Sequence, residues 1–369
     1  MKVVVDKNDL VNALTVVEKA LPSNAVVPIT AGLLLQAKES KLVIVANNLD
    51  YRITGVVSAE TDQDGELVVP KAFIGAAKAM PDDIIKLEAT ADGDSHSLRM
   101  TSGKSSFNFY PESAEEFPVG TPEEEWVYWQ EVKFNSADLK DIINMVAFSV
   151  SKEHFRPAFM GVKLSIHEDG RLACVSSDTF RVSYVEKSIE EGMEPVDFLI
   201  PGKALGELVR IINNQDISCF FSHSEIVFDL GDYVFATRLI DQKYPDVASA
   251  FSDDNNTTVV VDPSVLKKMV DRASLMAGKG DPKVFIYTKE DQLGISAEGD
   301  TGSMNEVVPA SIEGEEIESV VLNPKFITEP LKHIKGKDVT IGFNGRKGPM
   351  VISEDSDSVK FKYLALPML

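Results

Sequence analysis

The stretch Leu199-Ile-Pro-Gly-Lys-Ala-Leu-Gly-Glu-Leu-Val-Arg-Ile-Ile212 decides the fold, because two related stretches occur elsewhere in the chain. The first copy is Val68-Val-Pro-Lys-Ala-Phe-Ile-Gly-Ala-Ala-Lys-Ala-Met80, and the third is Val320-Val-Leu-Asn-Pro-Lys-Phe-Ile-Thr-Glu-Pro-Leu-Lys-His-Ile334. Each copy runs from apolar, strand-like residues through a proline and a lysine to apolar residues at helical spacing. Proline suits a helix start because its φ is already helical. Each copy therefore predicts a strand that leads into a short amphipathic helix.

Each copy also places a lysine in the first turn of its predicted helix, where a cation opposes the helix dipole. One such lysine is typical of an ordinary solvated face. Three lysines at equivalent positions, each slightly unfavourable for its helix, favour a function for the positive charge. For each single copy, an incidental lysine on a solvated face remains the alternative.

The spacing of the repeat sets the number of domains. Pro70, Pro201 and Pro324 are separated by 131 and 123 residues, about a third of the 369-residue chain. A period of this length indicates triplicated domains, not a solenoid of short repeats. Acidic, proline-containing or asparagine-rich segments at 112–125 and 245–257 are typical of linkers. We place the domains at 1–128, 129–256 and 257–369.

Other segments recur at the same phase. A strand followed by a helix opens each third, with Asp6, then Asn135 or Ser136, and finally Asp262 as the N-cap. A hairpin follows in each third, and a second strand pair closes it. The expected first hairpins are 32–37 with 41–46, 161–166 with 171–175, and 284–288 with 292–297, and Glu39-Ser40 is the expected turn of the first one. The expected closing pairs are 96–100 with 105–109, 225–230 with 233–239, and 349–353 with 358–364. Short strands with two helices per unit predict an α+β fold.

Composition points to a cytoplasmic protein with several hydrophobic cores. The chain is 44% hydrophobic, without an apolar run that approaches a membrane span or a recognisable signal peptide. Cys174 and Cys219 lie in apolar, strand-like surroundings without metal-ligand spacing. They are expected to be buried free thiols in a reducing compartment.

The distribution of charge says more than its total. The net charge is −21, which argues against a protein that coats DNA with its whole surface. The six predicted helices carry a net +8, so the strands and loops carry −29. The sequence therefore predicts basic helices and acidic sheets on different faces.

No active site is evident in the sequence. The histidines do not pair at metal-ligand spacing, and phosphate-loop, dinucleotide, hydrolase and zinc-protease motifs are not found. The run Ser176-Ser-Asp-Thr-Phe-Arg181 holds a serine and an acid but no neighbouring histidine, and it is more typical of a capped turn. We expect a non-catalytic protein with no cofactor and no bound metal.

These features together resemble the beta subunit of bacterial DNA polymerase III, the sliding clamp family, over essentially the whole chain. The residues that carry the resemblance are Pro28-Ile29, Val69-Pro70-Lys71, Asp178 with Arg181, Tyr244-Pro245-Asp246 and Leu366-Pro367-Met368. The resemblance implies a clamp fold in a head-to-tail dimeric ring, with helices inside and sheets outside. Duplex DNA would thread the ring, which would tether the replicative polymerase without doing chemistry. The alternatives are an accessory or decoy clamp that does not serve the main replicase, and a triplicated enzyme scaffold.

The resemblance also implies a pocket for short clamp-binding peptides of the polymerase alpha subunit, the clamp loader, repair polymerases and mismatch-repair proteins. The implied pocket residues are Phe159, Ser177, Thr179, Phe180, Arg181, Val182, Pro245, Ala250, Leu364, Leu366, Pro367 and Met368. In this pocket Arg181 is expected to supply a charged edge that can hold a backbone carbonyl or a carboxylate of the ligand. Independently, the apolar chain end Tyr363-Leu-Ala-Leu-Pro-Met-Leu369 is too hydrophobic for a free tail, so it is expected to pack or bind.

Two further residue sets follow from the resemblance. The expected DNA-facing residues are Lys71, Lys78, Lys152, Arg156, Lys203, Arg210, Lys268, Arg272, Lys325 and Lys332. At the expected dimer interface, the exposed side chains of Phe107 and Phe109 on an edge strand meet Leu275 and Met276 on a helix of the second copy.

The chain departs from the better-known family pattern at three places. Thr179-Phe180 replaces a frequent Gly-His, Met368 is followed directly by Leu369 without a basic residue, and Asn24 stands where some relatives have arginine.

Overall fold

The computed structural model describes residues 1–92, 95–122, 125–126, 129–189, 194–213, 216–252, 254–278, 280–355 and 359–368. The expected domain boundary after residue 128, the acidic residues 123 and 124, and Leu369 lie outside the described residues. By internal contacts the chain forms two compact units. Unit 1 comprises Met1–Leu139 and Glu207–Leu239, and unit 2 comprises Lys140–Gly206 and Ile240–Leu369.

The six expected helices are confirmed within the described residues. They are α1 (Lys7–Val17), α2 (Ala72–Ala79), α3 (Ser136–Ala147), α4 (Gly202–Val209), α5 (Pro263–Ser274) and α6 (Pro324–Leu331). Short 3₁₀ helices are η1 (Glu18–Ala20), η2 (Pro28–Ala31), η4 (Pro157–Met160) and η5 (Ala248–Ala250).

The predicted N-caps form. The Asp6 carboxylate accepts hydrogen bonds from the backbone N–H groups of Asn8 and Asp9, at 2.7 and 3.1 Å. Asp262 caps α5 in the same way, and Asn135, not Ser136, caps α3. A side-chain oxygen at this position satisfies N–H groups that have no partner inside the helix.

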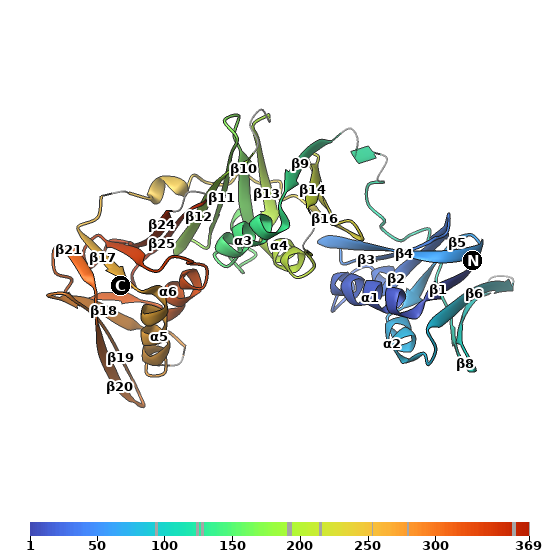
Figure 1. Ribbon diagram of the computed structural model, residues 1–369, viewed down its shortest axis with the longest axis horizontal. Coiled ribbons are helices and arrows are strands. Elements are labelled where there is room, and N and C mark those ends of the chain that lie inside the picture. The colour runs from blue at the N-terminus through green and yellow to red at the C-terminus, as the bar shows by residue number, and fades with distance from the viewer. Residues whose placement is uncertain are drawn as a thin grey trace. The chain divides into compact units, whose positions relative to one another are not determined.

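The helices bury apolar stripes against the sheets. In α1 the buried residues Leu10, Ala13, Leu14 and Val17 recur at helical spacing and face β4. Burying each leucine or valine is worth about 1.5–3 kcal/mol. Figure 1 shows α1 and α2 side by side against the strands of unit 1, and α5 and α6 make the equivalent pair in unit 2.

The expectation that proline opens each repeated helix is wrong for two copies. Pro70 and Pro201 are the last residues of β5 and β13, where they pair with Gly32 and Gly161. Both strands lie at sheet edges, and an edge position tolerates a residue without an N–H donor. Pro324 does begin α6, as expected.

Unit 1 contains a 12-stranded antiparallel sheet that includes strands from both of its chain segments. Its main order is β8-β7-β6-β1-β4-β16-β15-β14-β9, and β2, β3 and β5 extend it beside β4. The strands are β1 (Lys2–Asp6), β2 (Gly32–Lys38), β3 (Lys41–Asn47), β4 (Tyr51–Gln63), β5 (Gly65–Pro70), β6 (Ile84–Asp92), β7 (Ser95–Ser102), β8 (Ser105–Phe109), β9 (Gln130–Phe134), β14 (Ile217–Phe221), β15 (Glu225–Asp229) and β16 (Tyr233–Arg238).

Unit 2 contains a nine-stranded and a four-stranded sheet, with the orders β13-β10-β11-β12-β25-β24-β23-β17-β21 and β20-β19-β18-β22. The strands are β10 (Gly161–Ile166), β11 (Arg171–Ser177), β12 (Arg181–Ser188), β13 (Val196–Pro201), β17 (Thr257–Val261), β18 (Val284–Lys289), β19 (Gln292–Gly299), β20 (Gly302–Pro309), β21 (Ser311–Gly314), β22 (Val320–Leu322), β23 (Val339–Phe343), β24 (Met350–Asp355) and β25 (Val359–Ala365).

The strand order repeats with the sequence. β2-β3-β4, β10-β11-β12 and β18-β19-β20 are equivalent three-strand runs. The first strand of each run also pairs with a strand that leads into a helix, namely β5, β13 or β22. In unit 1 the third strand of its run, β4, pairs with β16, and in unit 2 the equivalent β12 pairs with β25. Both joints are antiparallel.

The two cysteines are buried and free, as expected. Burial raises the pKa of the Cys174 thiol to about 12 and raises that of Cys219 as well. Both thiols are therefore protonated at neutral pH and unreactive in the folded chain.

None of the helices in the described part of the chain has the length and apolar character needed to cross a membrane.

Candidate functional site

The turn between β11 and β12 is the most sharply built feature of the predicted pocket. The Asp178 carboxylate accepts hydrogen bonds from the N–H groups of Phe180 and Arg181, at 3.0 and 3.1 Å. Thr179 has a φ of 79°, a left-handed conformation that costs energy for a β-branched residue, and its N–H donates to the Ser177 hydroxyl. The fixed turn leaves the Phe180 side chain 61% exposed.

Arg181 does not act as the open, charged edge that the sequence suggests for this pocket. Its side chain is 11% exposed and its guanidinium is occupied. It donates to Asp178 at 2.8 Å, to Glu329, and to the Phe148 carbonyl at 2.7 Å. The Phe148 and Phe326 rings lie 5.6 and 4.9 Å from it.

The charged form of the Arg181 guanidinium is strongly stabilised. Burial alone would lower its pKa, but the Tyr363 oxygen, Glu329 and Asp178 outweigh burial, so the pKa is raised. Arg181 therefore fastens the turn to the rest of unit 2, and the expectation that it is free to hold a ligand carbonyl or carboxylate is corrected.

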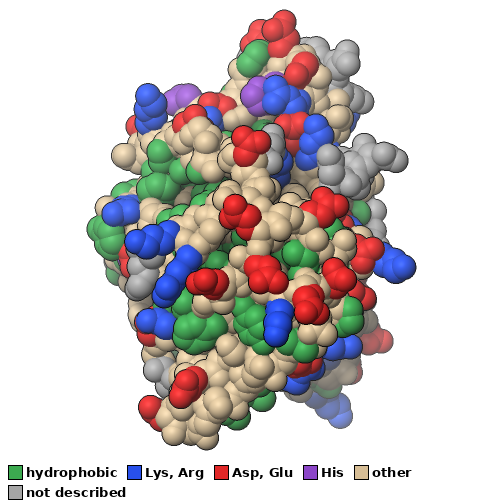
Figure 2. All heavy atoms as spheres, turned by 90° about the vertical axis from the view of Figure 1, so that its left-hand side faces the viewer, with side chains coloured by type: hydrophobic (Ala, Val, Ile, Leu, Met, Phe, Trp, Pro, Cys, Tyr) green, Lys and Arg blue, Asp and Glu red, His purple; other side chains and the backbone are tan. Residues whose placement is uncertain are grey.

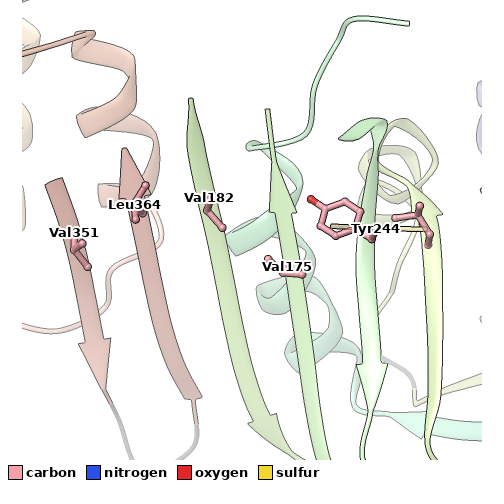
Figure 3. Packing of buried hydrophobic residues seen from close by; sticks show 6 residues of the cluster. Val175, Val182, Tyr244, Val351 and Leu364 are labelled. Carbon is pink, nitrogen blue, oxygen red and sulfur yellow. The ribbon is translucent and has the colours of Figure 1, made fainter. Parts of the chain in front are cut away.

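A cluster of apolar side chains lies beside this turn, in the region expected for the pocket. We call it the β12–β25 cluster; its buried members are Val175, Val182, Leu199, Tyr244, Val351 and Leu364. Figure 3 shows Val182 and Leu364 on adjacent strands, with Val351 on one side and Val175 and Tyr244 on the other. Two predicted pocket residues, Val182 and Leu364, thus belong to one buried cluster.

Half-buried side chains cover the cluster. The Phe159 ring meets Tyr244 edge-on, with 5.7 Å between ring centres. Val247 and Phe251 pack against the cluster from the segment that holds the predicted residues Pro245 and Ala250, which are themselves exposed. Tyr244 was not among the predicted pocket residues, although it directly precedes Pro245 in the motif Tyr244-Pro245-Asp246.

The end of the chain is held in place and partly exposed. The Leu366 N–H donates to the Phe180 carbonyl and the Met368 N–H donates to the Val321 carbonyl, each at 2.8 Å. The Leu366 side chain is 41% exposed, while Pro367 and Met368 are half-buried. The tail thus packs, as expected, and still presents apolar surface beside Phe180.

The predicted DNA-facing cations are all exposed. Three of them form ion pairs: Lys78 with Glu18 at 3.2 Å, Arg210 with Glu207 at 2.5 Å, and Arg272 with Glu306 through its Nε at 2.8 Å. Arg156 lies 5.6 Å from the Phe155 ring centre. Lys71, Lys325 and Lys332 form no salt bridge with the residues that the structure describes. The remaining members of the set are Lys152, Lys203 and Lys268.

The predicted dimer residues differ in exposure. Leu275, immediately after α5, is 75% exposed, and Phe107 on β8 is exposed as well. Phe109 is buried in unit 1, where it packs on Phe73 with 5.5 Å between ring centres, so the expectation that it is exposed is corrected. Phe107 and Phe109 lie on the same face of β8, where their rings stack at 6.3 Å. Phe109 is the one of the two that packs on Phe73 of α2. Met276 is half-buried.

Apolar side chains also gather on part of the molecular surface. On the face in Figure 2, hydrophobic side chains form patches between acidic and basic groups. Patches of this kind are typical of contact with another protein.

Comparison with known proteins agrees with the repeated architecture. Three family models match in order: the DNA polymerase III beta subunit N-terminal domain over residues 1–121, its central domain over 133–246 and its C-terminal domain over 248–369. The beta sliding clamps of Staphylococcus epidermidis and Staphylococcus aureus are 27% and 26% identical, and the matches cover 97% of this chain and 97% and 96% of those proteins.

Solved structures give the same result. The DNA polymerase sliding clamp of Bacillus subtilis has a TM-score of 0.94 at 26% identity, and the match covers 100% of this chain and 99% of that one. The DNA polymerase III beta subunit of Thermotoga maritima has a TM-score of 0.87 at 27% identity, with the same coverage. The fold is thus that of a three-domain DNA clamp. The chain belongs to the DNA polymerase III beta subunit family.

Proposed function

We propose that this chain is a sliding clamp: two copies close head to tail around duplex DNA and tether the replicative polymerase. The whole-length match to beta sliding clamps carries the proposal. It also favours service to the main replicase over an accessory or decoy role. In this proposal the chain is a cytoplasmic, non-catalytic subunit, and polymerase activity belongs to the holoenzyme. Its three domains span 1–128, 129–256 and 257–369.

The strand order supports ring closure. In two of the three repeated runs, the third strand pairs with the last strand of the next repeat: β4 pairs with β16, and β12 pairs with β25. The strands at the equivalent positions of the third pairing are β20, which corresponds to β4 and β12, and β8, which corresponds to β16 and β25. Both are terminal strands of their sheets. Unpaired edges are a liability that proteins usually cover. Pairing of β20 with β8 of a second copy would form the same joint, and two such joints would close a head-to-tail dimer.

The exposed helix-associated cations support contact with DNA phosphates. Such contacts position a protein without reading base sequence, and they weaken as salt rises because condensed counterions are released. Lys78, Arg210 and Arg272 are partly neutralised by their acidic partners. We therefore expect direct DNA binding to be weak and ring topology to determine retention.

Retention on DNA tests the ring directly. Rings placed by a clamp loader should remain on closed circular DNA and slide off linear DNA of the same sequence within the same period. Gel filtration of loaded complexes before and after a single restriction cut measures this. Blocking both ends of the linear DNA with bulky proteins should restore retention. Equal lifetimes on circular and open linear DNA would rule out encirclement.

The surface beside the β12–β25 cluster supports a second role in binding partner peptides. Phe180 and Leu366 are exposed next to each other through the Leu366–Phe180 backbone hydrogen bond. The clamp of Pseudomonas aeruginosa, which shares the fold at 19% identity, has been solved bound to griselimycin. We propose that the polymerase alpha subunit, the clamp loader, repair polymerases and mismatch-repair proteins insert leucine or phenylalanine anchors here. Because Arg181 is occupied, recognition would depend on apolar anchors and backbone groups.

Removing residues 366–369 should abolish most peptide binding without affecting the dimer. The deletion removes the exposed Leu366 side chain and the two hydrogen bonds that hold the tail. Each buried anchor is worth about 1.5–3 kcal/mol, so micromolar binding should fall at least tenfold. Fluorescence anisotropy with a Gln-Leu-Ser-Leu-Phe peptide measures the affinity, and a sizing column reports the assembly.

A milder pair of variants controls for loss of structure. Leu366→Ser should weaken peptide binding, whereas Val26→Ser, which changes a more exposed apolar residue in unit 1, should not. Unchanged affinity in the truncated dimer would place the partner site elsewhere.

A further inference from the structure

Unit 1 contains a hollow at the position that the repeat makes equivalent to the β12–β25 cluster. The turn before β4 matches the turn before β12: Leu49 has a φ of 74°, like Thr179, and the Asn48 side chain accepts from Asp50 and Tyr51 as Asp178 does from its followers. The two turns are therefore built in the same way.

Pairing registers fix which residues correspond. Asn47 faces Arg52 across its turn, as Ser177 faces Val182. At the joints, Arg52 pairs with Ala236, and Val182 pairs with Leu364. Arg52 therefore corresponds to Val182 and Ala236 to Leu364.

Two residues further along the joining strand, Arg238 corresponds to Leu366. Where unit 2 has two branched apolar residues and an exposed leucine, unit 1 has two arginines and a small alanine. The same place in the fold thus carries a different chemistry.

The hollow has a volume of about 80 Å³. Its lining includes buried Arg52, Ala236 and Thr237, and exposed Asp50, Gly120 and Arg238. It therefore has a buried floor and an exposed rim, with a guanidinium on each.

Arg52, on the floor of the hollow, has few hydrogen-bond partners for its guanidinium. The Arg52 side chain is 7% exposed, and its closest acidic partner, Glu225, is 3.5 Å away, at the limit of a hydrogen bond. Among the described residues, the other side-chain N–H groups of Arg52 have no acceptor. Arg181, by contrast, has three. Burial lowers the pKa of Arg52, and Glu225 opposes that effect. A bound acceptor would supply hydrogen-bond partners for these N–H groups.

Space around Arg52 is limited on one side. A methyl group on Gly120 would lie 1.3 Å from the Arg52 Nη1, so the connector backbone lies directly against the guanidinium. Gly120 has a φ of 78°, which favours glycine. This side of the guanidinium is closed, and an acceptor would have to enter from the rim formed by Asp50 and Arg238.

We propose that this hollow binds a carboxylate group, held by Arg52 at the floor and Arg238 at the rim. The planar guanidinium matches a carboxylate in geometry and charge. Asp50 and Glu225 also line the hollow, and their charges disfavour a doubly charged phosphate. The carboxylate belongs either to an acidic segment of a protein or to a free organic acid. The site is separate from the proposed peptide surface and does not depend on its function.

Binding of defined probes tests the site in the full chain. The first probe is a labelled Gly-Glu-Gly-Glu-Gly peptide with both ends blocked, with Gly-Gln-Gly-Gln-Gly as its neutral counterpart, followed by anisotropy. The second is succinate, followed by calorimetry. Both measurements use about 0.15 M salt, so that the net charge of −21 is screened beyond roughly 8 Å. We expect millimolar or tighter binding of an acidic probe and none of the neutral peptide.

Two variants and one control assign the binding. Arg238→Gln, at the exposed rim, should weaken the acidic probe about tenfold, the loss of one charged hydrogen-bonded contact. The double variant Arg52→Gln with Glu225→Gln removes both members of the buried pair, so it leaves no unpaired charge and should abolish binding. Lys41→Gln, an equal charge change outside the hollow, should have no effect.

The outcomes separate the two sources and the two sites. Variant-sensitive binding of the acidic peptide indicates a protein segment, whereas variant-sensitive binding of succinate alone indicates an organic acid. Failure of both acidic probes, equal binding of the neutral peptide, or indifference to both variants overturns the proposal. The Gln-Leu-Ser-Leu-Phe peptide is measured alongside, so a failure of the peptide surface in unit 2 is seen independently.

Discussion

Replacing Leu275 and Met276 by aspartate should convert the assembly from twice 40.4 kDa to a folded monomer of 40.4 kDa. In the proposed dimer these residues meet β8 of the second copy, and the replacement buries two unpaired carboxylates at each joint. Burying an unpaired charge costs several kcal/mol, and a closed dimer would incur this twice. Light scattering measures the mass over a range of protein concentrations.

Leu275 is well suited to this test because it is 75% exposed in the single chain. Leu275→Asp alone should therefore fold normally and still weaken the dimer. Met276 is half-buried, so circular dichroism and thermal melting of the double variant must show a native fold. Val26→Asp, at an exposed valine of unit 1, controls for added charge and should remain dimeric. A double variant that stays dimeric at nanomolar concentration would place the interface elsewhere.

Replacing Arg181 by methionine should destabilise unit 2 strongly. Methionine keeps much of the side-chain volume but leaves Asp178 and Glu329 without their shared cation and the Phe148 carbonyl without its donor. Removing one partner of a buried ion pair typically costs about 3–5 kcal/mol. Chemical denaturation measures the change in the free energy of unfolding.

Two further variants separate structure from ligand contact. Arg210→Met removes an exposed arginine with one acidic neighbour and should change stability by less than about 1 kcal/mol. Adding Asp178→Asn and Glu329→Gln to Arg181→Met removes the orphaned charges and should recover part of the loss. If Arg181→Met instead leaves stability intact and lowers peptide affinity alone, the guanidinium contacts the ligand and its structural role is minor.

Local signals were sufficient to predict the helices and several hairpins. Asp6 and Asp262 marked helix starts because a cap acts within three residues of itself. Glu39 and Ser40 formed the expected tight turn, both with positive φ. β4 was not predicted, although it is the longest strand among the described residues. Its second half is largely polar and exposed, so it lacks the continuous apolar pattern of a buried strand.

Long-range pairing explains what could not be predicted. Arg181 looked available because its acidic partner Glu329 lies 148 residues further along the chain. Arg52 was not predicted as a site residue, because its correspondence to Val182 depends on the register of β4 with β16 and of β12 with β25. Phe109 could not be distinguished from Phe107, because both lie on the same face of β8 and Phe73, which contacts Phe109, lies more than 30 residues earlier in the chain.

Unit 1 is built from two separate segments of the chain, which affects how the chain folds during synthesis and where it can be cut into fragments. β4 obtains its neighbour along residues 51–55 from β16, which is synthesised about 180 residues later. Until then a nascent chain carries an open hydrogen-bonding edge that can pair with another copy. A fragment cut at the end of the first sequence repeat keeps that edge permanently. Soluble pieces of this protein should therefore retain Glu207–Leu239 together with Met1–Leu139.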